Sequence, residues 1–255
     1  MSGNAPLGAA SDPDRIAERI AAMRGGHTAA PGPESVPPGS PGNGNSGKRT
    51  RFAGAGRQWA RAGVVVVAFV VALYVIELID ALTPYHWLDR NLGVEPREVD
   101  GLDGVVFAPV LHGGWDHLAG NTLPVLILGF LTLATGIGRG VAATAIIWLF
   151  AGAGTWLVGG AGTIHIGASS LVFGWLAYLI CRGWFVRRIG QIALGLVVLA
   201  GYGSLLWGVL PGQDGISWQG HLFGALGGVL AGWVVSRGER RQRRQHSAGP
   251  PAAPR

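Results

Sequence analysis

Charged residues are scarce in this sequence. Asp, Glu, Lys and Arg make up only 13% of its 255 residues, whereas hydrophobic residues make up 49% and the mean hydropathy is +0.35. A soluble domain of this size carries about a quarter charged residues. Because the middle of the chain is almost continuously apolar, the composition excludes an ordinary soluble domain and indicates an all-α polytopic membrane protein.

Cysteine is nearly absent as well. The single Cys181 cannot form an intramolecular disulfide and has no second thiol with which to bind a metal. His112, His117 and His165 are the candidates for a zinc site, but no HExxH motif accompanies them. We therefore expect neither a metal site nor another cofactor.

Negative charge is outnumbered by positive charge, with a formal net charge of +6 and a pI near 10.4. The basic residues lie beside apolar segments and in the tails, which is the pattern that orients a protein in a membrane. We therefore expect these basic residues to lie at the surface of the lipid bilayer and not to bind nucleic acid.

Six apolar segments alternate with polar loops. They cover residues 62–82, 117–134, 141–158, 166–180, 189–210 and 218–235. Basic residues precede the first segment and follow the second, fourth and sixth, whereas the loop after the first segment is mainly acidic. By the positive-inside rule both termini are cytoplasmic. We expect an integral protein of the bacterial plasma membrane with six transmembrane helices.

The two ends of the chain lack apolar segments. Residues 1–60 are rich in Pro, Gly and Ser and predict a disordered cytoplasmic tail, in which residues 12–23 suit one short amphipathic helix. Residues 237–255 predict a second disordered tail, which is basic. The membrane domain is expected to cover residues 61–236.

Four polar residues are predicted to lie at one depth. In this topology the second, fourth and sixth segments all enter the membrane from the outer face. His117 and Asn121 open the second segment, Ser169 opens the fourth, and His221 lies about one turn into the sixth. Since a helix rises about 1.5 Å per residue, all four side chains are expected just below the outer surface.

Ser169 is the candidate nucleophile, and His221 is the base that it needs. The alternative for His221 is a buried histidine that is hydrogen-bonded to a backbone carbonyl. No Asp or Glu on the second to sixth segments can orient the imidazole. The residues therefore predict a dyad and not a triad.

Small residues at a four-residue spacing predict how the fourth and sixth segments meet. The sixth segment carries glycines at positions 220, 224, 228 and 232. Ser170 and Gly174 have the same spacing on the fourth segment. Two such ridges allow close backbone approach, which would bring His221 to Ser169.

His117 and Asn121 are candidate donors to an oxyanion. They are four residues apart on one face of a helix start, and the backbone N–H of Ser169 is a third donor. Asn121 has an alternative role in capping or bridging helices. Glu77 and Asp80, on the first segment, are either hydrogen-bonded interior groups or markers of an aqueous path.

Three motifs together resemble the rhomboid intramembrane serine proteases. They are His112-Gly113-Gly114-Trp115-Asp116-His117-Leu118-Ala119-Gly120-Asn121, then Gly167-Ala168-Ser169-Ser170, then Gly220-His221-Leu222-Phe223-Gly224. The resemblance covers roughly residues 62–236. It implies a six-transmembrane-helix rhomboid fold, in which a serine–histidine dyad cuts transmembrane-anchored proteins near the outer membrane face.

The resemblance also assigns roles to single residues. Ser169 matches the nucleophile, His221 the base, and His117 and Asn121 the oxyanion donors. Gly167 matches the glycine before the serine, and His112 matches a second histidine five residues before the oxyanion one. This sequence departs from the pattern at two positions, with Ser170 in place of a glycine and Phe173 in place of a tyrosine. The ring of Phe173 can still stack on His221, but without a hydroxyl group.

Two other functions remain open at this point. One is a catalytically inactive rhomboid-like protein that binds membrane clients. The other is a small transporter, with Glu77, Asp80 and His221 lining its path, although no internal repeat supports it. The sequence indicates no particular oligomeric state.

Overall fold

The computed structural model describes residues 46–213 and 215–247. The features below belong to the unit Lys48–Arg255. The expected N-terminal tail up to residue 45, with its short amphipathic helix, and the last eight residues of the C-terminal tail lie outside the described residues.

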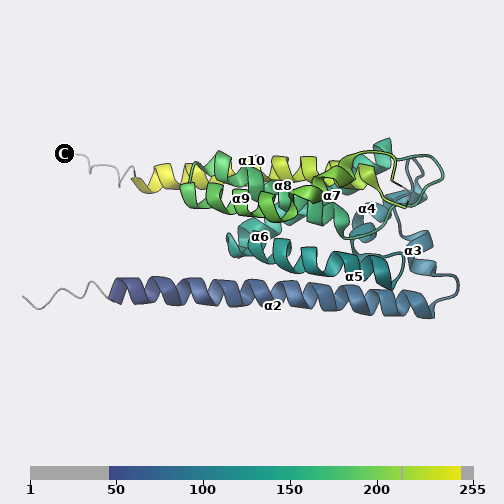
Figure 1. The fold of residues 1–255 in the computed structure, drawn as a ribbon, viewed down its shortest axis with the longest axis horizontal. Helices are drawn as coiled ribbons and strands as arrows, with labels where there is room; N and C mark the ends of the chain where they lie inside the picture. The colour runs from purple at the N-terminus through teal and green to yellow at the C-terminus, as the bar shows by residue number, and fades with distance from the viewer. Residues whose placement is uncertain (1–45, 214, 248–255) are drawn as a thin grey trace, which may run out of the picture. The chain divides into compact units, whose positions relative to one another are not determined.

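The described residues form helices and no strand (Figure 1). The elements are α2 (Ser46–Leu82), α3 (Trp87–Asn91), η1 (Asp100–Leu102), α4 (Gly104–Phe107), η2 (Ala108–Val110), α5 (Trp115–Pro124), η3 (Val125–Gly129), α6 (Phe130–Ala134), α7 (Ile137–Val158), α8 (Ser169–Val186), α9 (Ile189–Tyr202), η4 (Gly203–Val209) and α10 (Trp218–Ser247).

Five helical stretches of the described chain are long and apolar enough to cross a membrane. They are Gly54–Leu82, Trp115–Ala134, Ile137–Val158, Ser169–Val186 and Ile189–Val209. The architecture is therefore that of an all-α membrane protein, as the composition predicted. The sixth expected segment lies in α10, whose 30 residues end in an arginine-rich stretch and which is not among the five.

Two helices continue beyond the apolar segments. α2 begins at Ser46 and not near residue 62, and α10 continues to Ser247 although residue 237 was expected to begin a tail. Residues 46–61 and 237–247 contain no proline, so nothing in either stretch blocks the backbone hydrogen bonds of a helix. Polarity marks where the apolar part ends, but not where the helix ends.

The second apolar segment is interrupted. Pro124 ends α5, and the next five residues form η3, a π-helix, before α6 completes the segment. Proline has no N–H to donate to the preceding turn, and π-helical turns accommodate such a break. Pro124 faces the large cavity described below.

α8 is the central helix of the unit. About two thirds of its apolar stretch (67%) is buried, against 28% for the stretch in α2 and 11% for α9 and η4. Its side chains Leu171, Leu176 and Tyr178 are completely buried, and α8 packs against α7, α9 and α10. The residue that begins α8 is therefore held by the best-packed element of the fold.

The two ridges of small residues face each other, as predicted. A Cβ atom on Gly224 would overlap the carbonyl oxygen of Ser170, and one on Gly228 would overlap that of Gly174. The backbones of α8 and α10 thus touch along two turns, which only residues without a side chain allow.

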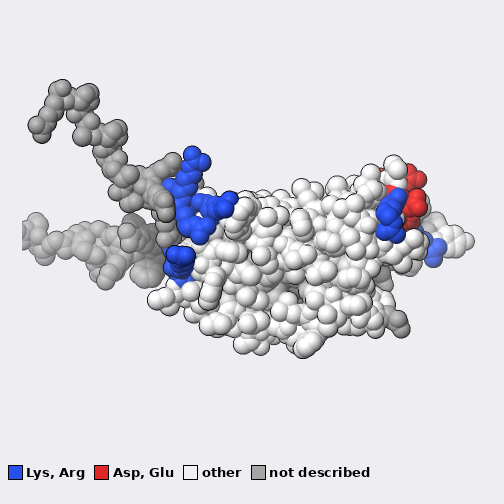
Figure 2. Space-filling model, turned by 90° about the horizontal axis from the view of Figure 1, so that it is seen from above, with Lys and Arg blue, Asp and Glu red and all other residues white. Residues whose placement is uncertain are grey.

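Charges gather at the two ends of the helical unit (Figure 2). At one end Arg182 donates to both oxygens of Glu239 at 3.1 Å, and Arg139 donates to the same carboxylate at 2.8 Å. This ion cluster ties α7 and α8 to α10. Acidic residues are grouped at the opposite end in the view of Figure 2.

Candidate active site

Ser169 and His221 meet where α8 and α10 begin. Ser169 is the first residue of α8, and His221 lies in the first turn of α10. The Nε2 atom of His221 is 2.8 Å from the Oγ atom of Ser169. The close packing of Gly224 on Ser170, one turn further along, allows this distance.

A backbone carbonyl orients the imidazole of His221. Its Nδ1 atom lies 2.9 Å from the carbonyl oxygen of Gly208, near the end of η4. Because a carbonyl only accepts, Nδ1 carries the proton and Nε2 is left to accept the hydroxyl proton of Ser169. The arrangement combines the two alternatives from the sequence, since His221 is bonded both to a carbonyl and to the serine.

Phe173 packs against the face of the His221 imidazole. Its ring and that of His221 are stacked, with centroids 4.0 Å apart and planes 10° from parallel. Phe173 follows Ser169 by one turn of α8, so a single helix supplies both the hydroxyl and the stacking partner. Packing and one hydrogen bond thus fix the imidazole, which has no carboxylate partner among the described residues.

His117 faces the same site from α5. The backbone N–H of Gly113 donates to its Nδ1 atom at 3.3 Å, which leaves Nε2 as the protonated nitrogen. A Cβ atom on Gly167 would lie 2.9 Å from Nε2 of His117 and 3.6 Å from Oγ of Ser169. Gly167 also has a φ angle of +119°, which favours glycine. Its missing side chain lets the two groups approach.

Asn121 lies one turn beyond His117 and is buried, with 7% of its surface exposed. Its Nδ2 atom donates to the carbonyl oxygen of His117 at 3.0 Å. An amide nitrogen carries two hydrogens, so this bond leaves one donor. The bond lies within α5, and does not bridge two helices.

His112 lies beneath the loop that precedes Ser169. It is 1% exposed, its Nε2 atom is 3.5 Å from the backbone nitrogen of Ala168, and its ring meets that of His117 edge-on at 5.3 Å. Burial, with a smaller contribution from the charge of His117, lowers the pKa of His112 to about 4. His112 is therefore neutral at pH 7 and supports the loop as an uncharged group.

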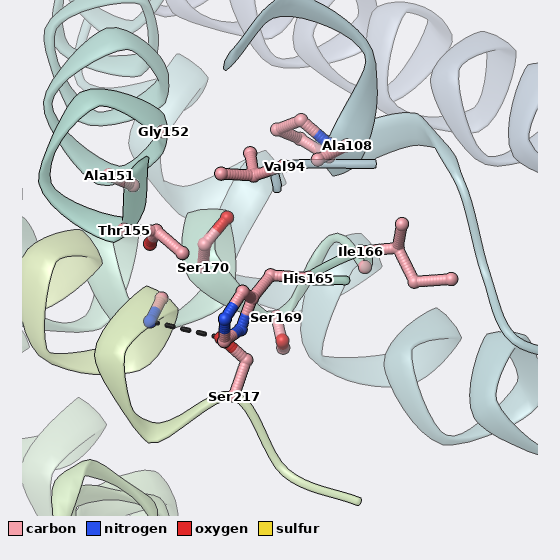
Figure 3. A pocket seen from close by; sticks show the side chains of 13 residues that line it. Val94, Ala108, Ala151, Gly152, Thr155, His165, Ile166, Ser169, Ser170 and Ser217 are labelled. Carbon is pink, nitrogen blue, oxygen red and sulfur yellow. Dashed lines mark hydrogen bonds between the residues drawn. The ribbon is translucent and has the colours of Figure 1, made fainter. Parts of the chain in front are cut away.

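His165 joins three loops around the site (Figure 3). Its Nδ1 atom lies 2.7 Å from Oγ of Ser217 and its Nε2 atom lies 2.8 Å from Oγ1 of Thr163, while its backbone pairs with Val94. Ser217 in turn accepts the N–H of Gly220 at the start of α10. Burial lowers the pKa of His165. This network holds the first turns of α8 and α10 in register.

One large cavity contains all four predicted residues. Its volume is about 940 Å³, and its walls come from α5, α8, α10, η4 and the loops beside them. Ser169, His221, His117 and Asn121 all line it. A smaller cavity of about 30 Å³ lies on the other side of Ser169, between Thr155, His165 and Ser170 (Figure 3).

Gly208 is the residue that the sequence did not reveal. Its contribution is a main-chain carbonyl, which any residue could supply and which no motif marks. A Cβ atom at this position would lie 2.9 Å from Cζ of Phe173 and 3.2 Å from Nδ1 of His221, so the site requires glycine here. Only the path of η4 shows this requirement.

The fold and the site define a class: an α-helical membrane protein in which a serine and a histidine are paired at one end of two packed helices. The family model described as the rhomboid domain matches residues 101–238. The chain belongs to the rhomboid family. This confirms the family that the three motifs indicated.

Mycobacterial proteins are among the relatives. Proteins described as uncharacterized in Mycobacterium tuberculosis and Mycobacterium bovis are each 50% identical over 200 residues, which are 75% of this chain and 82% of the relative. A protein of Mycobacterium leprae, also described as uncharacterized, is 48% identical over 200 residues, 75% of this chain and 78% of the relative.

Proposed function

We propose that this chain is an intramembrane serine protease that cleaves transmembrane-anchored proteins near the outer membrane face. The observation that carries the proposal is the 2.8 Å contact between Ser169 and His221, with the imidazole oriented by Gly208. Rhomboid proteins are generally serine proteases, although some are inactive. The orientation of both groups is what a dyad without a carboxylate needs.

The proposed reaction follows from the proton positions. His221 accepts the hydroxyl proton at Nε2 while Oγ of Ser169 attacks the scissile carbonyl carbon. The tetrahedral intermediate then expels the amine, which takes that proton from His221, and an acyl-enzyme remains. A water molecule, activated in the same way, hydrolyses the ester and restores Ser169. Gly208 keeps its bond to Nδ1 throughout and stabilises the imidazolium.

The developing oxyanion has three donors within the site. They are Nε2–H of His117, the second amide hydrogen of Asn121, and the N–H of Ser169 at the positive end of α8. The missing side chain of Gly167 leaves room between His117 and Ser169 for an oxygen atom. A substrate helix must unwind to expose its carbonyl, so helix-breaking and small residues should favour cleavage.

α10 supplies the sixth transmembrane helix in this proposal. Its first half packs on α7 and α8, so its polar His221 is shielded from lipid. We place both termini in the cytoplasm of a bacterium and the loop after α2 outside, because basic residues gather alone at one end of the helices and lie among acidic residues at the other (Figure 2). The catalytic domain then covers residues 61–236.

Cysteine labelling tests this topology. In a Cys181→Ser background, a membrane-impermeant reagent applied to intact cells should modify Asp100→Cys and should spare Arg241→Cys. Both positions are exposed. The reverse pattern would place the dyad at the cytoplasmic face and would refute the proposed orientation.

Incubation with a panel of transmembrane reporter proteins in proteoliposomes tests the activity. The wild type should release fragments cut near the outer end of the reporter helix, and a fluorophosphonate should form an adduct on Ser169. A wild type that folds and yields neither fragments nor adduct would refute the proposed activity and favour an inactive member of the family.

A further inference from the structure

Four ionisable side chains lie together at the outer end of α2, outside the catalytic site. Glu77 and Asp80 are three residues apart on α2, Asp89 belongs to α3, and His86 lies in the loop between the helices. The three carboxylates are almost completely buried, with 2%, 1% and 8% of their surfaces exposed, whereas the side chain of His86 is 55% exposed. The sequence did not predict this cluster, because it depends on how the loop returns onto α2.

The cluster has the spacing of metal ligands. One oxygen each of Asp80 and Asp89 and one ring nitrogen of His86 lie within 4.8 Å of one another. The Oδ2 atom of Asp80 and the Nδ1 atom of His86 are hydrogen-bonded at 2.9 Å, and this is also the separation of neighbouring ligands about 2.1 Å from a metal in octahedral geometry. These two atoms would therefore need little movement to share a cation.

Two buried carboxylate oxygens have no partner among the described residues. They are Oδ1 of Asp89 and Oε2 of Glu77. A buried carboxylate oxygen without a donor is destabilising by several kcal/mol at the order-of-magnitude level, so a native structure normally supplies a counter-charge.

Asp80 is already oriented as a ligand would be. Its Oδ1 atom accepts the backbone N–H of Leu88 at 2.8 Å, which leaves Oδ2 directed at His86. Such a bond fixes the orientation of a ligating carboxylate from behind. His86, the exposed member, provides the side from which a cation can reach the buried oxygens.

We propose that Asp80, His86 and Asp89, with Glu77 beside them, bind one divalent transition-metal cation of the Mn²⁺ type. Mn²⁺ and Zn²⁺ accept both carboxylate and imidazole ligands, whereas Mg²⁺ and Ca²⁺ prefer oxygen alone. Bound there, the cation neutralises the buried carboxylates and joins α2 to α3.

Manganese binding to the full-length protein in detergent tests the proposal independently of proteolysis. After removal of metals with a chelator and addition of Mn²⁺, electron paramagnetic resonance should show one bound ion per chain and the thermal midpoint should rise. Mg²⁺ should bind more weakly. Asp89→Asn, which keeps the shape of the side chain, should weaken Mn²⁺ binding at least about 10-fold.

Two further variants keep the test decisive. His86→Gly removes the exposed ligand and suits the left-handed backbone of this residue, whose φ is +54°, so it should fold and bind at least about 10-fold more weakly. Asp100→Asn, at an exposed carboxylate of η1, should bind as the wild type does. Absence of Mn²⁺ binding to the wild type, unchanged affinity in Asp89→Asn or His86→Gly, or an equal loss in Asp100→Asn would overturn the site.

Discussion

The carbonyl oxygen of Gly208 lies 2.9 Å from Nδ1 of His221, on the opposite side of the imidazole from Ser169. In serine proteases with a triad, a carboxylate occupies this position and stabilises the imidazolium. A carbonyl fixes the same tautomer, but it carries only a partial negative charge. The base in this site is thus oriented as well as in a triad, and its protonated form is stabilised less.

Gly208→Ala should lower turnover. The added methyl group would meet the ring of Phe173 and Nδ1 of His221, and must push one of them away. A displacement of the base by about 1 Å can reduce the rate about 100-fold. We expect kcat to fall by that order in a reporter assay while KM changes little, because Gly208 acts on the base.

Gly201→Ala is the matched control. Gly201 belongs to the same segment, in α9, and nothing lies within 4 Å of a Cβ atom built on it. This variant should cleave at the wild-type rate. Equal activity of Gly208→Ala and Gly201→Ala would show that the carbonyl does not position His221.

Asn121→Ala should impair turnover more than substrate binding. Its amide acts on charge that develops in the transition state, and loss of one such donor typically lowers kcat about 100- to 1,000-fold. Thr122→Ala is the control, because its hydroxyl lies near Tyr74 of α2 and bonds to Leu118, away from the cavity. A kcat for Asn121→Ala equal to that of Thr122→Ala would remove Asn121 from the oxyanion site.

Gly224→Ala should destabilise the fold. Its methyl group would overlap the carbonyl oxygen of Ser170, a backbone atom that cannot rotate away, and overpacking of this kind costs about 1–3 kcal/mol. We expect a lower thermal midpoint in detergent together with slower cleavage. Gly238→Ala, further along α10 where a Cβ atom meets nothing within 4 Å, should leave both unchanged. A stable and active Gly224→Ala would contradict close packing of α8 on α10.

The loop network around His165 should make stability depend on pH. Burial lowers the pKa of His165 in the folded protein below its ordinary value of 6.5. The stability that depends on its neutral form is complete above the unfolded value and is lost as the pH falls below it. The thermal midpoint should drop between about pH 7.5 and pH 5.5, and should drop less in His165→Gln. Parallel midpoints in the two proteins would show that His165 does not contribute.

The sequence predicted those parts of the site that depend on helix period and depth. Ser169, His221, His117 and Asn121 meet because each lies near the start of a helix that enters from one end. The facing of Gly224 and Gly228 on α8 was predictable for the same reason, since the spacing of small residues fixes a helix face.

The remaining parts depend on tertiary structure and were not predictable. The bond from Gly208 to His221 comes from a main-chain atom near the end of η4. Asp89 comes close to Asp80 because it belongs to α3, and this helix of five residues is too short to show a periodic pattern of apolar residues in the sequence. The starting residue of α2 also depended on helix propensity in a polar stretch, where hydropathy gives no boundary.

Cleavage of one transmembrane reporter by the wild type, Ser169→Ala, His221→Ala and the double variant tests the central claim most directly. The reporter, the lipid and the amount of folded protein are kept the same. If Ser169 attacks while His221 takes its proton, each single variant should lose cleavage, and the double variant should be no worse than either. Cleavage by Ser169→Ala at the wild-type rate would contradict the account.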